Sequence, residues 1–230
     1  REPFESRKCR HMLTGAVDVK YCANNYDCAR CEFDQMLDEV QPGLAAPDPS
    51  VDIVAGFALP EGHYFHRGHT WARVEYGGRV RVGMDDFSLR LLGRPDAFEM
   101  PGLGRAVGQG ADACALRKEG HEAVLRSPVE GVVVAINPEI QDPAEAAHDS
   151  PYGRGWLMMI EPARLSRSLK GLLFGEELAP WIEDEASRLS ALVTRETDHP
   201  LAATGGRAVD DIHAAVPALD WDRLVRTFIR

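Results

Sequence analysis

The sequence predicts an α+β protein that is mainly β, with a short cysteine-rich segment before the β-rich core and helices after it. Between residues 58 and 163, short apolar segments alternate with Gly/Pro turns, which is typical of a sandwich or barrel. Between residues 164 and 230, leucines and tryptophans recur at helical spacing. Four of the five cysteines lie within the first 31 residues. A chain of 230 residues is long enough for one full core and a smaller appended unit.

Composition divides the chain into four predicted segments. Residues 1–40 form a polar, cysteine-rich segment, and residues 41–57 form a linker. The linker contains Pro42, Gly43, Pro47 and Pro49, which cannot sustain a helix or a central strand. Residues 58–163 form the β-rich domain, and residues 164–230 form a helical extension.

The β-rich domain shows three clear strand signals and one helix. Residues 79–82 alternate Arg and Val after the Gly77-Gly78 turn, which predicts a hairpin. Residues 132–136 and 157–160 predict two further strands. Residues 85–92 predict a short helical insert, whose first residues Asp85 and Asp86 we interpret as caps of its N–H groups.

The extension carries its apolar residues on helical faces. Leucines at 165, 169, 172 and 173 fit one helix, and apolar residues between 178 and 189 fit a second. Residues 221–228 fit a third. The aromatic residues of this segment either cover the barrel or bind a partner, and the sequence leaves both open: Phe174, Trp181, Trp221 and Phe228.

Charge and hydropathy exclude several classes of protein. The net charge of −10 argues against a nucleic-acid-binding protein, which needs a basic surface. No apolar segment approaches the roughly 20 residues that a membrane span requires. Residues 1–9 contain no apolar signal core, so we expect a cytoplasmic protein. No P-loop, Gly-x-Ser-x-Gly or nucleophile–base pattern is present, so we do not expect an enzyme.

The clustered cysteines predict a metal site. Cys9, Cys22, Cys28 and Cys31 follow the pattern C-x12-C-x5-C-x2-C, and a C-x2-C pair lets two thiolates reach one ion. A segment of about 40 residues with few apolar side chains needs such a ligand to fold. We predict zinc as the cofactor, with an iron–sulfur cluster or disulfides as alternatives. His11 could replace one of the cysteine ligands.

Two other candidates have structural interpretations. Cys114 stands alone on a predicted strand, which favours a buried structural thiol over a nucleophile. His63, His66 and His69 form an H-x2-H-x2-H pattern, but the surrounding sequence predicts a loop leading into a strand. We therefore expect surface or structural roles for these histidines.

Three stretches resemble the glycine cleavage system H protein, a family with the lipoyl-domain fold. The first begins at His69-Thr70-Trp71 and continues through residues 78–87 to Leu91-Leu92-Gly93. The second runs from Gly104 to Ser127-Pro128-Val129-Glu130-Gly131. The third and most specific is Pro151-Tyr152-Gly153-Arg154-Gly155-Trp156-Leu157. The resemblance implies a barrel-sandwich hybrid whose tight hairpin presents a lipoylated lysine.

The resemblance also locates that lysine, and this chain lacks it. Counting forward from Gly104 and backward from Pro128, both family spacings place the lysine at Gly120. Glycine at a hairpin tip is explained by its tolerance of positive φ. Lys118, two residues earlier, is the alternative lipoyl site, because a shift of two keeps the same sheet face.

Together these observations predict a non-catalytic scaffold or accessory subunit that mediates protein–protein interactions in a larger assembly. Lipoate is not expected as a cofactor, and the partners are proteins, not nucleic acid. One alternative is a lipoyl carrier modified at Lys118. The other is an electron-transfer subunit, if the cysteines hold iron and sulfur.

Overall fold

The computed structural model describes residues 8–13, 17–24, 27, 30–34, 49–140, 144–198, 203–204 and 206–229. The helices are α1 (Arg10–Leu13), α3 (Asp86–Leu92), α4 (Glu145–Asp149), α5 (Leu165–Leu169), α6 (Leu178–Thr197), α7 (Ile212–Ala215) and α8 (Trp221–Phe228), with 3-10 turns at Tyr76–Gly78, Pro138–Ile140 and Gly175–Glu177. The strands are β1 (Val51–Val54), β2 (Phe57–Pro60), β3 (Tyr64–Phe65), β4 (Thr70–Val74), β5 (Val80–Met84), β6 (Ala97–Glu99), β7 (Ala106–Val107), β8 (Asp112–Lys118), β9 (His121–Arg126), β10 (Gly131–Ile136), β11 (Met158–Pro162), β12 (Ala203–Thr204) and β13 (Arg207–Ala208).

The chain forms two compact units. The first comprises Arg1–Ala45 together with the turn Tyr76–Gly78, and the second comprises Ala46–Glu75 and Arg79–Arg230. Within the first unit, the described regular elements include α1, the 3-10 turn at Tyr76–Gly78 and a bridge between Lys8 and Tyr21.

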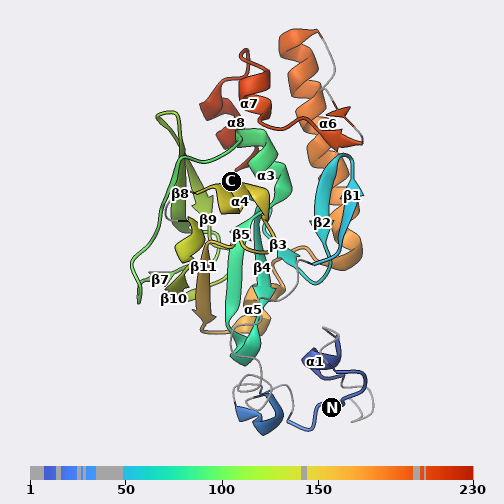
Figure 1. The fold of residues 1–230 in the computed structure, drawn as a ribbon, viewed down its shortest axis with the longest axis vertical. Coiled ribbons are helices and arrows are strands. Elements are labelled where there is room, and N and C mark those ends of the chain that lie inside the picture. The colour runs from blue at the N-terminus through green and yellow to red at the C-terminus, as the bar shows by residue number, and fades with distance from the viewer. Residues whose placement is uncertain are drawn as a thin grey trace. The chain divides into compact units, whose positions relative to one another are not determined.

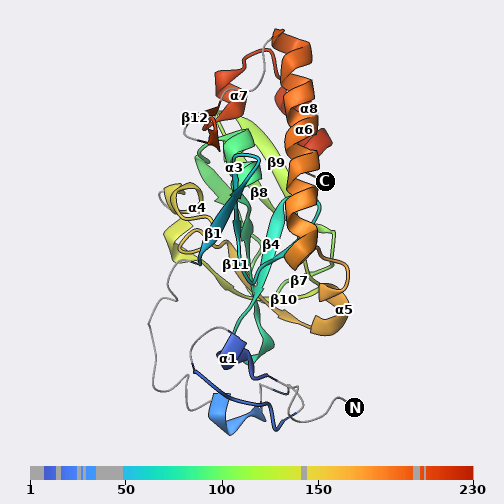
Figure 2. The same ribbon diagram turned by 90° about the vertical axis from the view of Figure 1, so that its right-hand side faces the viewer.

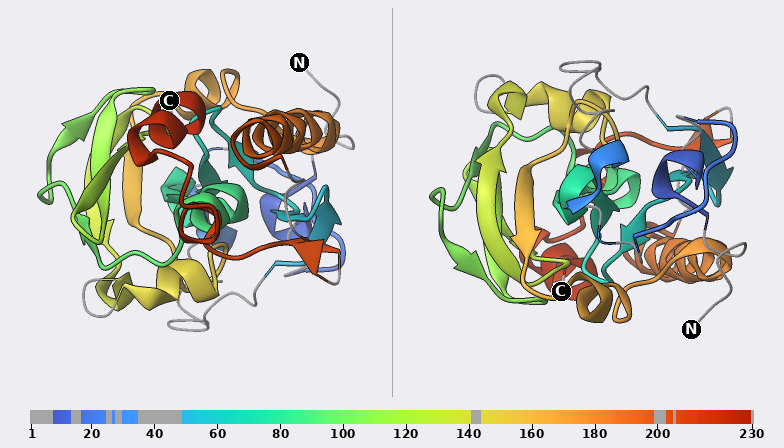
Figure 3. Two further views of the ribbon diagram at one scale, coloured as in Figure 1. Left: turned by 90° about the horizontal axis from the view of Figure 1, so that it is seen from above. Right: turned by 90° about the horizontal axis from the view of Figure 1, so that it is seen from below.

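Two antiparallel sheets form the core of the second unit (Figure 1). The larger has six strands in the order β3-β4-β5-β11-β10-β7, and the smaller has three in the order β6-β8-β9. Figure 3 shows the small sheet and α6 on opposite sides of the large sheet. The architecture is mixed α and β and mainly β, as the sequence predicts, and the strands predicted at 79–82, 132–136 and 157–160 are present.

The aromatic motifs of the sequence supply the centre of the core. Trp71 is fully buried, and its indole N–H donates to the carbonyl of Met84 at 2.8 Å. The Tyr152 hydroxyl donates to the carbonyl of Ala58 at 2.7 Å and accepts from the Asp86 amide at 2.9 Å. Burial, together with the nearby Asp85 carboxylate, raises the Tyr152 pKa well above its usual value, so this phenol stays protonated as a donor.

Helix α6 covers the sheet through one apolar face (Figure 2). Trp181 on this helix stacks on the ring of His69 at 5.0 Å between centroids, and His69 stacks in turn on Phe87 at 4.3 Å. The other buried residues of α6 are Leu178, Ile182, Glu185, Leu189 and Val193. The C-terminal helices therefore cover the core. Of the two roles that the sequence left open, covering the barrel or binding a partner, the burial of Trp181, Trp221 and Phe228 fits the first.

Three details differ from the sequence predictions. Strand β1 lies within residues 41–57, the predicted linker, because Ala55-Gly56 closes a hairpin with β2. A second short hairpin, β12–β13, interrupts the helical extension. Phe174 is 43% exposed and stacks on Tyr64 instead of entering the core. No helix among the described residues is long and apolar enough to cross a membrane.

Candidate functional site

The hairpin β8–β9 ends in a two-residue turn. Lys118 pairs with His121 across the hairpin, so Glu119 and Gly120 form the tip. Both have positive φ, +50° and +84°, which is the type I′ geometry that matches the twist of a two-stranded ribbon. A Cβ added at Gly120 would meet no atom within 4 Å. The tip is therefore exposed, and glycine relieves the backbone strain at its second position.

Lys118 does not share this exposure. Its side chain lies inside the molecule, with only 4% of the residue exposed. The ammonium Nζ donates to Asp211 Oδ2 at 2.5 Å and to the Leu92 carbonyl at 3.1 Å. The lysine is thus held in an ion pair with the C-terminal segment and points away from the hairpin tip.

Asp211 is positioned for this ion pair by its place at the start of α7. Its Oδ1 accepts from the Ala214 amide at 3.1 Å, which caps the helix, and this leaves Oδ2 for Lys118. Gly93 makes room for the carboxylate, because a Cβ at position 93 would lie 2.3 Å from the Asp211 Cγ. Leu92 and Gly93, at the end of α3, therefore leave the space that the Asp211 carboxylate occupies.

We call residues 207–213 the C-terminal strap. Besides Asp211, three of its residues, Arg207, Ala208 and Asp210, hold it to the core through four contacts. Ala208 donates to the Gly56 carbonyl at 3.0 Å and accepts from Arg90 at 2.8 Å. Arg207 reaches Asp86, and Asp210 lies 2.9 Å from His148. Through Asp211, the strap also contacts Lys118, the last residue of β8 before the turn.

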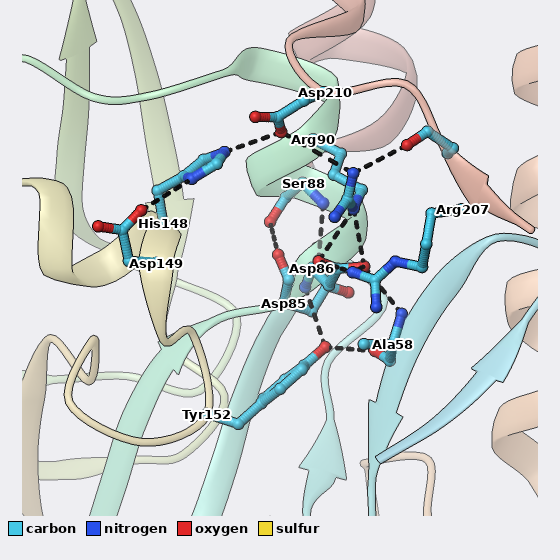
Figure 4. A network of polar contacts seen from close by, with 11 residues as sticks. Ala58, Asp85, Asp86, Ser88, Arg90, His148, Asp149, Tyr152, Arg207 and Asp210 are labelled. Carbon is cyan, nitrogen blue, oxygen red and sulfur yellow. Dashed lines mark hydrogen bonds and ion pairs between the residues drawn. The ribbon is translucent and has the colours of Figure 1, made fainter. Parts of the chain in front are cut away.

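Asp86 is the central anchor of the strap (Figure 4). Its carboxylate accepts from the Ala58 amide at 2.8 Å, from Arg90 at 3.1 Å and from Arg207 at 3.0 Å. The interpretation of Asp86 as a helix cap is therefore wrong, because Asp85 alone caps α3 by accepting from the Ser88 amide at 2.8 Å. Asp86 instead joins β2, α3 and β13.

Aromatic contacts hold the other side of the hairpin. Trp221 at the start of α8 stacks on His121 at 5.1 Å, and its indole N–H donates to the Glu122 carbonyl at 2.8 Å. His213 contacts both rings edge-on. Burial, with a further contribution from the Lys118 charge, lowers the His213 pKa, so the neutral ring is favoured here.

The three histidines of the H-x2-H-x2-H pattern have separate environments. His63 is buried against Trp71, and burial lowers its pKa to about 4. His69 is buried, with Nδ1 2.7 Å from Asp85 Oδ2 and Nε2 4.0 Å from Glu185 Oε2. His66 accepts from the Gly68 amide at 3.0 Å. These positions agree with the expected structural roles.

Cys114 is buried in β8, and burial raises its pKa to about 12. A thiol with this pKa is not a nucleophile at neutral pH. The structural interpretation of Cys114 is therefore supported by its position.

The N-terminal cysteines belong to the first unit. Cys9, Cys22 and Cys31 line one cavity together with aromatic and charged residues that include Tyr21, Lys20 and Phe33. Cys28, the remaining predicted ligand, lies outside the described residues. His11 contacts the carboxylate of Asp34. Within the described ranges, no group of three or more His, Cys, Asp or Glu side chains is placed to hold a metal ion, so the site stays a prediction.

Comparison with known proteins identifies the family of the core. Residues 63–185 match the model of the glycine cleavage H-protein family. The chain belongs to the glycine cleavage H-protein family. A probable glycine cleavage system H protein from Pyrococcus horikoshii is 32% identical over 130 residues, which cover 56% of this chain and 96% of that protein. The glycine cleavage system H protein of Xanthomonas axonopodis pv. citri is 35% identical over 127 residues, covering 55% and 96%. The crystal structure of an H protein from Mycobacterium marinum aligns with a TM-score of 0.46 and 22% identity, covering 55% of this chain and 98% of that one.

Members of the H-protein family are carrier proteins that work in a multi-protein system and are not enzymes. This confirms the expectation of a non-catalytic protein.

The matched region ends at residue 185, before the strap and α8. The strap anchors Asp211 and Arg207 were not found from the sequence. The one available signal was Asp210-Asp211 before the short run Ile212-His213-Ala214-Ala215, which is a helix N-cap pattern.

Proposed function

We propose that this H-protein family member is a non-catalytic scaffold or accessory subunit that binds protein partners in a larger assembly and carries no lipoyl group. The observation that carries the proposal is the arrangement at the β8–β9 hairpin. Its exposed tip is Glu119-Gly120, and its lysine, Lys118, is paired with Asp211 beneath the strap. A lipoyl group needs a lysine amine that a ligase can reach, and the exposed tip offers none.

The number and positions of the lysines strengthen this proposal. The chain has four, Lys8, Lys20, Lys118 and Lys170, and Lys118 is the one on the hairpin. Acylation of Lys118 would require its amine to leave both Asp211 and the Leu92 carbonyl and to lose its proton. It would also leave the Asp211 carboxylate beside Leu92 and Gly93 without its counter-charge, which is unfavourable in a partly buried site. A carrier modified at Lys118 is therefore the weaker candidate.

We further propose that Cys9, Cys22, Cys28 and Cys31 bind structural zinc in the first unit. The clustering of Cys9, Cys22 and Cys31 around one cavity supports this assignment. Four thiolates would close the coordination sphere, so the ion would stabilise the fold and leave no open position for catalysis. An iron–sulfur cluster uses the same ligands and is the alternative.

The lipoylation assay uses the whole chain with a lipoate–protein ligase, lipoate and ATP. We expect the wild-type chain to remain unmodified by intact-mass analysis. Gly120→Lys places an amine at the open tip and is expected to gain one lipoyl group. Gly120→Arg imposes the same backbone strain without an acylatable amine and serves as the matched control. Lipoylation of the wild-type chain that disappears in Lys118→Met would overturn the proposal.

The scaffold part of the proposal is tested on the chain purified from its own cells. Size-exclusion chromatography with light scattering should give a mass above that of the 25.3 kDa monomer, because of stoichiometric partner proteins. A monodisperse monomer without partners would contradict this part.

A further inference from the structure

The hairpin β1–β2 precedes the region that matches the H-protein family, which begins at residue 63. It is closed by Ala55 and Gly56, with φ of +50° and +91°, which is a two-residue turn of the primed class. In such a hairpin, the residues beside the turn exchange hydrogen bonds, and the pairs then alternate. Val54 and Phe57 are therefore hydrogen-bonded, and the N–H and C=O of Ile53 point away from β2.

Other contacts fix the same alternation independently. Ser50 accepts from the Glu61 amide at 3.2 Å, two pairs beyond the bonded pair Asp52–Leu59. Pro60, which has no N–H, stands opposite Val51 at a non-bonded position. The backbone groups of Val51 and Ile53 thus face outward along the free edge of β1.

The opposite edge of the hairpin is already occupied. The outward amide of Ala58 donates to Asp86, and its carbonyl accepts from Tyr152. On the β1 edge, no hydrogen bond joins the outward groups of Val51 or Ile53 to any part of the chain that the structure describes. The edge of β1 is therefore the side on which this two-stranded sheet can accept another strand.

The side chains on this edge indicate what kind of strand it would accept. Val51 is 44% exposed and Ile53 is 45% exposed, on the same face of the strand. Asp52 and Glu61 are exposed near them, and neither forms an ion pair with a described residue. Figure 2 shows β1 on the side of the second unit that faces the viewer.

We infer that the outer edge of β1 is a strand-addition site for an extended, basic segment of a partner protein. Main-chain hydrogen bonds to Val51 and Ile53 would supply the affinity. Apolar side chains alternating with Lys or Arg would cover the Val51–Ile53 face and neutralise Asp52 and Glu61. The inference names a partner surface for the proposed scaffold, and its test does not depend on the lipoylation assay.

The probe is an acetylated, amidated heptapeptide of alternating Lys and Val, added to the full ¹⁵N-labelled chain. In the free chain, the amides of Val51 and Ile53 should exchange with solvent faster than those of Asp52 and Val54. With the peptide, we expect both exposed amides to shift and their exchange to slow at least tenfold. A peptide with Glu in place of Lys should bind at least tenfold more weakly.

The matched variants separate backbone pairing from apolar contact. Ile53→Pro removes the outward N–H without removing a bond to β2, and it should weaken peptide binding at least tenfold. Ile53→Thr keeps that N–H and should bind more tightly than Ile53→Pro. A peptide that is N-methylated at alternate residues tests the same bonds on the unchanged protein, and it should lose binding.

Three results would overturn the inference. One is peptide binding that Ile53→Pro and N-methylation both leave unchanged, and another is chemical shift changes confined to other elements. The third is a dimer of the chain alone that Ile53→Pro dissociates, since β1 would then pair with a second copy. A failure here would leave the lipoylation result untouched, so the two proposals can fail separately.

Discussion

The ammonium of Lys118 lies 2.5 Å from Asp211 Oδ2, joining residues that are 93 positions apart in the chain. This ion pair connects the β8–β9 hairpin to the C-terminal strap and keeps the lysine beneath it. Lys118 is 4% exposed, whereas the Asp211 side chain is 31% exposed, so the pair is buried on one side only. Its contribution to stability therefore lies between that of a surface pair and that of a fully buried one.

Lys118→Met should lower the free energy of unfolding by about 1–3 kcal/mol, because it removes the counter-charge of Asp211 while retaining the apolar stem. Urea denaturation measures this. Lys170→Met removes an exposed lysine and should change stability by less than about 0.5 kcal/mol. A double-mutant cycle with Asp211→Asn should show coupling, since asparagine can still cap α7. Additive effects of the two substitutions would mean that the ion pair contributes nothing.

Asp86→Asn should loosen the strap, because Asp86 holds both Arg90 and Arg207 while accepting from the Ala58 amide. We expect a loss of about 1–3 kcal/mol and faster hydrogen exchange in residues 207–213. Asp112→Asn is the matched control, because that carboxylate forms an exposed pair with Arg126, away from the strap. Unchanged exchange in the strap would contradict the role given to Asp86.

Stability should fall in mild acid because of His63. Burial lowers its pKa from 6.5 to about 4, so the folded state favours the neutral ring, with Nδ1 bonded to the Glu61 carbonyl. The unfolded chain binds the proton more readily, so this contribution is complete above pH 6.5. It is lost as the pH falls towards 4, by about 3 kcal/mol in total. His63→Gln should flatten the pH dependence of urea unfolding in this window, whereas His148→Gln should leave the His63 contribution in place.

Removal of metal should affect the first unit selectively. If zinc occupies the four-cysteine site, the purified chain should contain one zinc per chain by elemental analysis, and a chelator should unfold the first unit. Cys28→Ser should lose the metal, whereas Cys114→Ser should retain it. Visible absorption with two or more irons per chain would instead identify an iron–sulfur cluster.

The sequence predicted what local patterns determine. Alternation at residues 79–82 gave β5, and Asp85 before an apolar helix gave the cap of α3. The motif from Pro151 to Leu157 pointed to the family that residues 63–185 match. In each case the signal lies within a few residues of the element that it specifies.

The contacts that anchor the strap could not be predicted from local sequence patterns. Asp86 and Arg207 are 121 positions apart, and nothing in the pattern near either residue indicates its partner. The hairpin β1–β2 was missed because all four residues of β2 are buried, which removes the alternation that marks a half-buried strand. Lys118 was correctly placed on the hairpin, but its burial depends on Asp211, which lies outside the matched region.

The absence of a lipoyl group is tested most directly by intact-mass analysis of the native chain from its own cells, with fragmentation to locate any modification among the four lysines. We predict the mass of the unmodified polypeptide and an unmodified Lys118. An added lipoyl mass on Lys118 would show that the strap opens to release the lysine and that the protein is a carrier.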